Sequence, residues 1–445
     1  MSNLPFGRHR AKISAQQSVS EETLAYARSL DQTRVGLGPG KLALGEWAAR
    51  GLALPDLDAI RGYRLERIRE KLRLFDYGGI VVSDPLNVRY ATDSSNMQVW
   101  TMHNNVRYCF IATDGPVILF DFKRVEHLSQ HLELIDEVRP ATMWSYLVAG
   151  ERSEQFADQW AAELADLVRQ HGGGNMRLAI DRVNAEGVWA LQKEGLSIQN
   201  GEEVMELARA IKSDEEIKAM RCAVDACQQS MHVMQSKLVP GISEQGLWSH
   251  LHAENIKRGG EWLETRLLAS GPRTNPWYQE CSSRIIEEGD IVAFDTDLIG
   301  SYGMCVDVSR TWLCGDVKPS DEQREIYQIA YDQLMHNREL PKAGLTFQEV
   351  SAQAKSLPPE YLPNRYTVLY HGVGLCDEYP SLAYKEDWHA IGTEGTFQPN
   401  MVVCVESYVG RVGGREGVKL EEQLLITENG VEPLSSYPYE ADFLA

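Results

Sequence analysis

Carboxylate side chains stand in or directly after apolar segments in the C-terminal half of the sequence, where a buried strand would normally carry no charge. The positions are Asp295, Asp297, Asp307, Glu406 and Glu421. A buried carboxylate is unfavourable unless a cation or a metal ion pairs with it. One such residue alone is better read as a strand-end side chain that faces water. Five together predict a site that binds cations.

A histidine at a strand end adds a nitrogen donor to these oxygens. His371 follows the apolar run TVLY and opens the segment HGVGLCDEYP, in which Asp377 comes six residues later. If His371 converges with the five carboxylates, the set is too anionic for one ion and suits two divalent cations bridged by carboxylates. A structural zinc site is disfavoured, because it would use cysteines or several histidines. Iron, manganese, cobalt, nickel and zinc remain possible on this reasoning.

The pattern of predicted helices and strands changes near residue 205. Before it, helical and strand patterns alternate, beginning with a helix over residues 64–75 and a buried strand within GGIVVSDP. This alternation predicts an α/β domain. After it, Ser213 and Glu216 predict a capping box that opens a long amphipathic helix. We expect an N-terminal extension over residues 1–62, an α/β domain over 63–208 and a metal-binding catalytic domain over 209–445.

The overall composition disfavours several classes of partner. The 445-residue chain has a formal net charge of −20 and a pI near 5.1, which argues against binding to nucleic acid or anionic membranes. No apolar run has the length of a membrane span, and the first residues lack the apolar segment of a signal peptide. The eight cysteines form no CxxC pair, which favours free thiols in a reducing compartment. We therefore expect a cytoplasmic protein without nucleic acid or membrane partners.

The order Asp, Asp, His, Glu, Glu resembles the pita-bread metallopeptidases, which include methionine aminopeptidase, aminopeptidase P, prolidase and creatinase. The resemblance covers residues 63–445 through the blocks IKSDEEIKAMR, LLASGPRTN, EEGDIVAFDTD, DVSRTW, HGVG, MVVCVES and GVKLEEQLLITENGVE. It implies an α+β architecture, with a C-terminal pita-bread fold and a smaller creatinase-like α/β N-terminal domain. It also implies metal-ligand roles for Asp295, Asp307, His371, Glu406 and Glu421.

The sequence departs from these peptidases at the positions with which they handle peptides. Their block HGxGH ends in a histidine, but the fifth position here is Leu375. A later histidine is expected near Leu382 and an earlier one near Tyr278, and neither is present. These histidines bind the peptide and move protons at the scissile bond. Peptide hydrolysis is therefore disfavoured.

The segments FDTD, CVDVSRTW and HGVGLCDEYP more closely resemble the dimethylsulfoniopropionate lyases of marine bacteria, which belong to the same superfamily. This resemblance implies cleavage of dimethylsulfoniopropionate, a small zwitterionic sulfonium compound, to dimethyl sulfide and acrylate. It also implies a homodimer and a centre of two divalent metal ions, with iron favoured. In this branch Asp297 joins the metal ligands and Asp377 acts as the base.

The residues are compatible with such a β-elimination. A base must remove the proton beside the substrate carboxylate, and the turn after His371 should keep Asp377 near the metals. The cationic end of the substrate favours aromatic faces, for which Tyr366 and Tyr278 are the preferred candidates.

Two other functions stay open. An X-Pro dipeptidase or aminopeptidase would keep the same metal site, but it would need a replacement for the missing histidines. A catalytically inactive pita-bread module that binds a partner would usually lose metal ligands, whereas all of them are present here.

Overall fold

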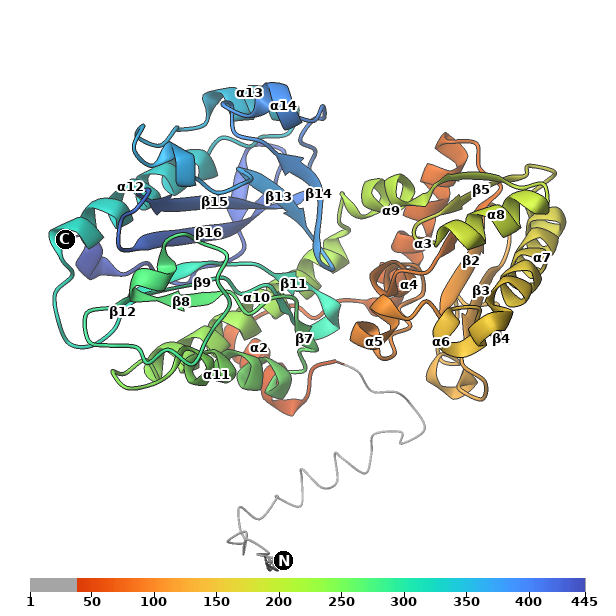
Figure 1. Cartoon of the computed structure of the whole chain (residues 1–445), viewed down its shortest axis with the longest axis horizontal. Coiled ribbons are helices and arrows are strands. Elements are labelled where there is room, and N and C mark those ends of the chain that lie inside the picture. The colour runs from red at the N-terminus through yellow and green to blue at the C-terminus, as the bar shows by residue number, and fades with distance from the viewer. Residues whose placement is uncertain (1–37, 445) are drawn as a thin grey trace, which may run out of the picture.

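The computed structural model of the protein describes residues 38–444 and shows two lobes that lie side by side (Figure 1). The smaller lobe is built from the N-terminal part of the chain, and the larger one holds the carboxylate-bearing strands. Helix α9 and the residues after it connect them.

The N-terminal lobe is a mixed six-stranded sheet with helices on both faces. Its strand order is β4-β3-β2-β1-β5-β6. The strands are β1 (Gly79–Val82), β2 (Tyr108–Ala112), β3 (Val117–Asp121), β4 (Glu137–Pro140), β5 (Arg177–Ile180) and β6 (Ser197–Asn200). The helices are α3 (Leu57–Leu74), α4 (Pro85–Thr92), α5 (Gln98–His103), α6 (Tyr146–Ala149), α7 (Ser153–His171), α8 (Ala185–Lys193) and α9 (Gly201–Arg209).

Successive side chains of each strand point to opposite faces of this sheet. Ile80 of β1 belongs to the same apolar cluster as Ile68 of α3, whereas the next residue, Val81, belongs to a different cluster on the opposite face, with Leu164 of α7. Successive side chains of a strand point to opposite faces, so a strand covered on both sides must be apolar throughout. This explains the continuous apolar runs in this part of the sequence.

The catalytic lobe contains one five-stranded and two three-stranded sheets, with orders β14-β13-β15-β16-β17, β12-β9-β8 and β11-β10-β7. The strands are β7 (Trp262–Leu263), β8 (Leu268–Ser270), β9 (Ile291–Phe294), β10 (Leu298–Ile299), β11 (Cys305–Val306), β12 (Arg310–Leu313), β13 (Tyr370–Val373), β14 (Asp377–Leu382), β15 (Val402–Gly410), β16 (Gly417–Ile426) and β17 (Val431–Pro433). The helices are α10 (Asp214–Ser236), α11 (Glu244–Lys257), α12 (Asp321–Arg338), α13 (Phe347–Gln353) and α14 (Trp388–Ile391).

Two separate apolar cores flank these sheets. Met220 and Met231 of α10 belong to the core that includes Phe294 of β9. Tyr327 of α12 belongs to the other, which includes Leu420 of β16. The sheets therefore lie between two helical layers, and polar side chains that point between the sheets are largely buried.

Helix α10 begins as the sequence predicts. Ser213 Oγ accepts the backbone N–H of Glu216, and the Glu216 carboxylate accepts the backbone N–H of Ser213, which completes the capping box. The predicted apolar face of this helix is buried. All eight cysteines are free, and only Cys376 is partly exposed.

The predicted extension over residues 1–62 contains ordered helices where the structure describes it. Helix α2 (Lys41–Arg50) packs through Ala43 and Trp47 against Cys222 and Ala226 of α10. Helix α3 runs across the boundary expected between residues 62 and 63. Residues 1–37 lie outside the described part, so the three domain limits stay predictions.

Within residues 38–444, no helix is both long and apolar enough to cross a membrane.

We predict that Trp47→Ala detaches α2 from the catalytic lobe, because the Trp47 side chain is completely buried against α10. Removing so large a side chain should lower the free energy of unfolding by about 3–5 kcal/mol. Denaturant unfolding of the lobe measures the loss. Leu42→Ala is the matched control, since Leu42 lies on the same helix and is 46% exposed. Equal effects of the two substitutions would show that α2 is not packed as described.

Candidate metal centre

The six predicted ligands converge between the sheets of the catalytic lobe. Asp295 and Asp297 lie in the connection from β9 to β10, and Asp307 follows β11. His371, Glu406 and Glu421 come from strands β13, β15 and β16, and all six side chains are buried.

Their donor atoms form overlapping groups. Asp307, His371 and Glu421 offer atoms within 4.8 Å of one another, together with the Cys404 thiol, and so do Asp295, Glu406 and Glu421. A third group joins Asp297 and Asp307 to Asp377. Glu421 and Asp307 each belong to two groups, which is the arrangement expected of carboxylates that bridge neighbouring cations.

Strand register explains part of this convergence. Glu406 and Glu421 are directly opposite each other in the antiparallel pair β15–β16. Like charges in that position repel and destabilise a sheet. The His371 ring reduces the repulsion between the two glutamates, because its Nε2 lies near both of them. The distances are 3.1 Å to Glu406 Oε1 and 3.4 Å to Glu421 Oε1. His371 Nε2 is also 3.5 Å from Asp307 Oδ2.

Lys419 is a buried cation within the cluster. Its Nζ lies 2.9 Å from Asp295 Oδ2, 2.7 Å from Glu406 Oε2 and 3.0 Å from Glu421 Oε2. The ring of Tyr366 lies 4.5 Å from the same nitrogen. Lys419 therefore balances one of the buried negative charges.

Burial and like-charge repulsion raise the pKa values of most of these carboxyl groups. Burial and the neighbouring Glu421 raise the pKa of Asp295 to about 7, although Lys419 opposes the shift. Burial and nearby carboxylates raise the pKa values of Asp297 and Asp307 well above their usual range. Glu421 differs, because Lys419 and His371 lower its pKa against the effect of burial. Without further cations, the cluster therefore retains protons.

The donor set fits two divalent cations. When ionised, the five carboxylates outnumber the one lysine by four charges, which equals the charge of two divalent ions. Asp307 Oδ1 and Glu421 Oε1 are buried and accept no hydrogen bond within the described residues. Buried oxygens of this kind are normally satisfied. Carboxylates with one imidazole suit iron, manganese, cobalt, nickel or zinc.

An open cavity of about 570 Å³ leads to this cluster. His371, Asp377 and Glu406 line it together with Tyr278 and Tyr366, whose rings stack with their centres 5.4 Å apart. The Asp377 carboxylate is half exposed, and its Oδ1 lies 3.6 Å from His371 Nδ1. The structure thus brings together every candidate that the sequence suggested for the metals, the base and the substrate.

Sequence reasoning missed three polar residues that support the predicted ligands. Besides Lys419, the Ser309 hydroxyl lies 2.6 Å from Asp295 Oδ1 and 2.9 Å from Glu421 Oε2. The Thr265 hydroxyl donates to Asp297. Of these three residues, only Lys419 could have been predicted from the sequence. It precedes Glu421 by two residues on a buried strand, so the two side chains must lie on the same face of the sheet.

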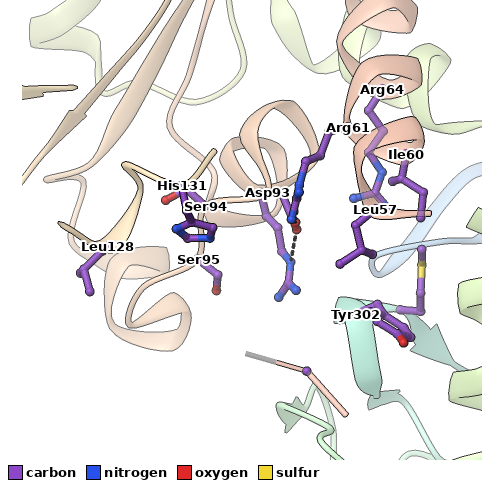
Figure 2. Close-up of a pocket in the computed structure, with 13 residues that line it drawn as sticks. Leu57, Ile60, Arg61, Arg64, Asp93, Ser94, Ser95, Leu128, His131 and Tyr302 are labelled. Atoms are coloured by element: carbon purple, nitrogen blue, oxygen red, sulfur yellow. Dashed lines mark hydrogen bonds and ion pairs between the residues drawn. The ribbon is translucent and has the colours of Figure 1, made fainter. Parts of the chain in front are cut away.

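A second cavity, of about 240 Å³, lies where the two lobes meet (Figure 2). Three arginines line it, and each pairs with a carboxylate: Arg61 with Asp93, Arg64 with Glu216, and Arg89 with Glu261. The last two pairs run from the N-terminal lobe to the catalytic lobe. This cavity therefore marks a junction held by ion pairs, away from the carboxylate cluster.

Two protein-family models match the N-terminal and the C-terminal parts of the chain separately. Residues 64–221 match the creatinase/prolidase N-terminal domain, and residues 218–428 match metallopeptidase family M24. The chain belongs to family M24. A dimethylsulfoniopropionate lyase from Roseovarius nubinhibens is 48% identical over 92% of this chain and 93% of its own length. Another dimethylsulfoniopropionate lyase, from Roseobacter denitrificans, is 42% identical over 94% of this chain and 95% of its own length.

The solved Xaa-Pro dipeptidase from Bacillus anthracis has a TM-score of 0.68 and 24% identity over 85% of this chain and 98% of its own. At that identity the likeness shows the fold alone. Together these matches confirm the predicted α+β architecture, with a pita-bread catalytic domain and a creatinase-like N-terminal domain. They also confirm the predicted resemblance to the lyase branch of the M24 family.

We predict that the M24 centre releases protons when it binds a divalent cation at pH 7, because Asp295, with a pKa of about 7, is partly protonated beforehand. The affinity should fall as the pH drops below 7, since the proton then competes with the cation. Calorimetric titration with Mn²⁺ in two buffers of different ionisation enthalpy counts the protons. Asp295→Asn should release fewer, and binding by the wild type without proton exchange would contradict the prediction.

Proposed function

We propose that this chain cleaves dimethylsulfoniopropionate to dimethyl sulfide and acrylate by β-elimination. The observation that carries the proposal is the likeness to two dimethylsulfoniopropionate lyases over more than nine-tenths of both chains. The site agrees with it, because a carboxylate, Asp377, stands at the mouth of the metal-binding cluster.

The proposed cofactor is a pair of divalent metal ions, with iron favoured. Asp295, Asp297, Asp307, His371, Glu406 and Glu421 are the proposed ligands. When bound, the two cations would stabilise the negative charge that develops on the substrate carboxylate as its neighbouring carbon loses a proton.

Asp377 is proposed to take that proton. As the C–H bond breaks, its electron pair forms the C=C bond of acrylate, and the C–S electron pair leaves with sulfur as neutral dimethyl sulfide. The leaving group needs no proton, so one base suffices. Partial burial in the cavity raises the pKa of Asp377 above its usual range, although His371 opposes the shift, and a raised pKa makes the carboxylate a stronger base.

The sulfonium end is proposed to rest against Tyr366 and Tyr278. Their stacked rings line the same cavity as Asp377, and the ring of Tyr366 already lies close to the ammonium group of Lys419. Aromatic faces attract cations through the ring quadrupole. The homodimer and the cytoplasmic location that the sequence suggested belong to this proposal as well.

Peptide hydrolysis is the weaker alternative. Leu375, which replaces the last histidine of the peptidase block, is 2% exposed and packs in the apolar core, so it offers no polar group to a peptide. An inactive binding module is weaker still, because the complete carboxylate cluster would then be buried without a use.

Headspace detection of dimethyl sulfide tests the function. Purified protein loaded with Fe²⁺ or Mn²⁺ should release dimethyl sulfide from dimethylsulfoniopropionate, and a chelator should stop the release. The same samples should leave an X-Pro dipeptide intact. Dipeptide cleavage without dimethyl sulfide would favour the peptidase, and neither reaction would favour the binding module.

We predict that Asp377→Ala lowers kcat by at least about a hundredfold, because removal of a general base costs roughly 10²–10⁴ in rate. Its metal content, measured by mass spectrometry, should equal that of the wild type. Glu421→Ala should instead lose metal and activity together. Asp316→Ala, in an exposed loop, is the control. Release of dimethyl sulfide by Asp377→Ala at the wild-type rate would refute the assignment of the base.

A further inference from the structure

Strand β14 carries Asp377 at the edge of the catalytic sheet that faces the N-terminal lobe (Figure 1). Adjacent residues of a strand point in opposite directions. Asp377 and Glu378 both line the cavity above the metal cluster, but the Asp377 side chain is 52% exposed, whereas that of Glu378 is 1% exposed. The base therefore sits on a strand whose other side is buried against α9.

Glu378 is held there by two cations, Arg209 at the end of α9 and Lys212 in the segment that connects the two lobes. Lys212 Nζ donates a hydrogen bond to Glu378 Oε1 at 2.8 Å, and Arg209 Nε forms an ion pair with Glu378 Oε2 at 2.6 Å that is not directed as a hydrogen bond. Both cationic side chains are about 5% exposed or less. A buried ion pair adds little stability compared with apolar packing, but removing one partner is strongly unfavourable, because the other charge is then left buried and unpaired. Such a pair is suited to fixing a position.

Arg209 is itself fixed by the N-terminal lobe. Its guanidinium donates to the side chains of Asn87 in α4 and Glu206 in α9. The other oxygen of Glu206 accepts the backbone N–H of Tyr379 at 2.7 Å. The two residues that follow Asp377 are thus both bound to the end of α9.

The glycines of the HGVG segment make room for this arrangement. A Cβ atom on Gly374 would lie 1.7 Å from Glu378 Oε1, and one on Gly372 would lie 2.4 Å from the Tyr379 carbonyl oxygen. A side chain at position 372 would collide with the backbone of β14, so the close approach of the two strands requires glycine there. A side chain at position 374 would displace the Glu378 carboxylate from its present place.

The Asp377 carboxylate has weaker direct support. Its contact with His371 Nδ1 is 3.6 Å long, which exceeds a good hydrogen bond. The position of the Asp377 carboxylate is therefore determined mainly by the backbone of β14. That backbone is fixed by Glu378 and Tyr379.

We propose that Arg209, Lys212 and Glu378 form an interlobe clamp that positions Asp377 over the substrate. The three are positioning residues, and the inference rests on the proposed role of Asp377 as base. Without the clamp, the first residues of β14 would move relative to the metal cluster. A displacement of about 1 Å can reduce the rate about a hundredfold.

Kinetics of Arg209→Met test the clamp. We expect kcat to fall about ten- to a hundredfold, with KM and metal content unchanged, because only the proton transfer is impaired. With substrate deuterated at the carbon beside the carboxylate, the isotope effect on kcat should increase as proton removal becomes more rate-limiting. Arg209→Lys should recover part of kcat.

Arg107→Met is the matched control. Arg107 forms an equally buried pair with Asp121 at 2.8 Å within the N-terminal sheet. It should lower the melting temperature but leave kcat and the isotope effect of the folded enzyme unchanged. If Arg209→Met does not fold, Glu378→Gln replaces it, since this variant keeps the size of the side chain and removes its charge.

A double-mutant comparison separates positioning from a general structural role. In an Asp377→Ala background there is no base to position, so adding Glu378→Gln should not reduce the residual rate further. A further loss of the same size would overturn the clamp, as would wild-type kcat and isotope effect in folded Arg209→Met and Glu378→Gln. Failure of the wild type to release dimethyl sulfide would instead overturn the proposed function.

Discussion

The repulsion among buried carboxylates is the constraint on which the catalytic lobe depends. Glu406 and Glu421 face each other across two strands, and Asp295, Asp297 and Asp307 approach from the neighbouring sheets. Water screens these charges only weakly, because helical layers cover both sides and the five side chains are buried. Like charges at such distances interact far more strongly in a protein interior than in water. The arrangement is stable only with protons, with Lys419 and His371, or with metal cations.

Burial of apolar side chains in the two cores stabilises the strands that carry these charges. The residues of β15 and β16 that point away from the cluster, such as Val405 and Leu420, pack with helix α12. On the other side, α10 packs against β11 and shares an apolar core with β9. Each strand thus presents an apolar face to a helix and a polar face to the centre. The free energy gained by burying the first face allows the second to stay charged.

The sequence indicated which side chains converge, because carboxylates are conspicuous in apolar strands and because His371 follows such a strand directly. It also predicted the start of α10, since a capping box depends only on residues three apart. Contacts that depend on the tertiary fold were less accessible. Lys419 had a local signal in its spacing from Glu421, but its contact with Asp295 depends on how two sheets meet. The pairing of Arg209 with Glu378 depends on how two lobes meet, and no local pattern encodes it.

The segment HGVGLCDEYP combines three of these constraints in ten residues. His371 reaches the carboxylates, the two glycines admit β14 and the Glu378 side chain, and Leu375 fills the apolar core. Peptide hydrolysis needs polar groups to bind the amide and protonate its nitrogen, and a buried leucine cannot provide them. Elimination of a neutral sulfide has no such requirement, because the leaving group departs without a proton. In the proposed function, Leu375 in place of a histidine leaves the proposed metal ligands unchanged, and a base beside them is sufficient for elimination.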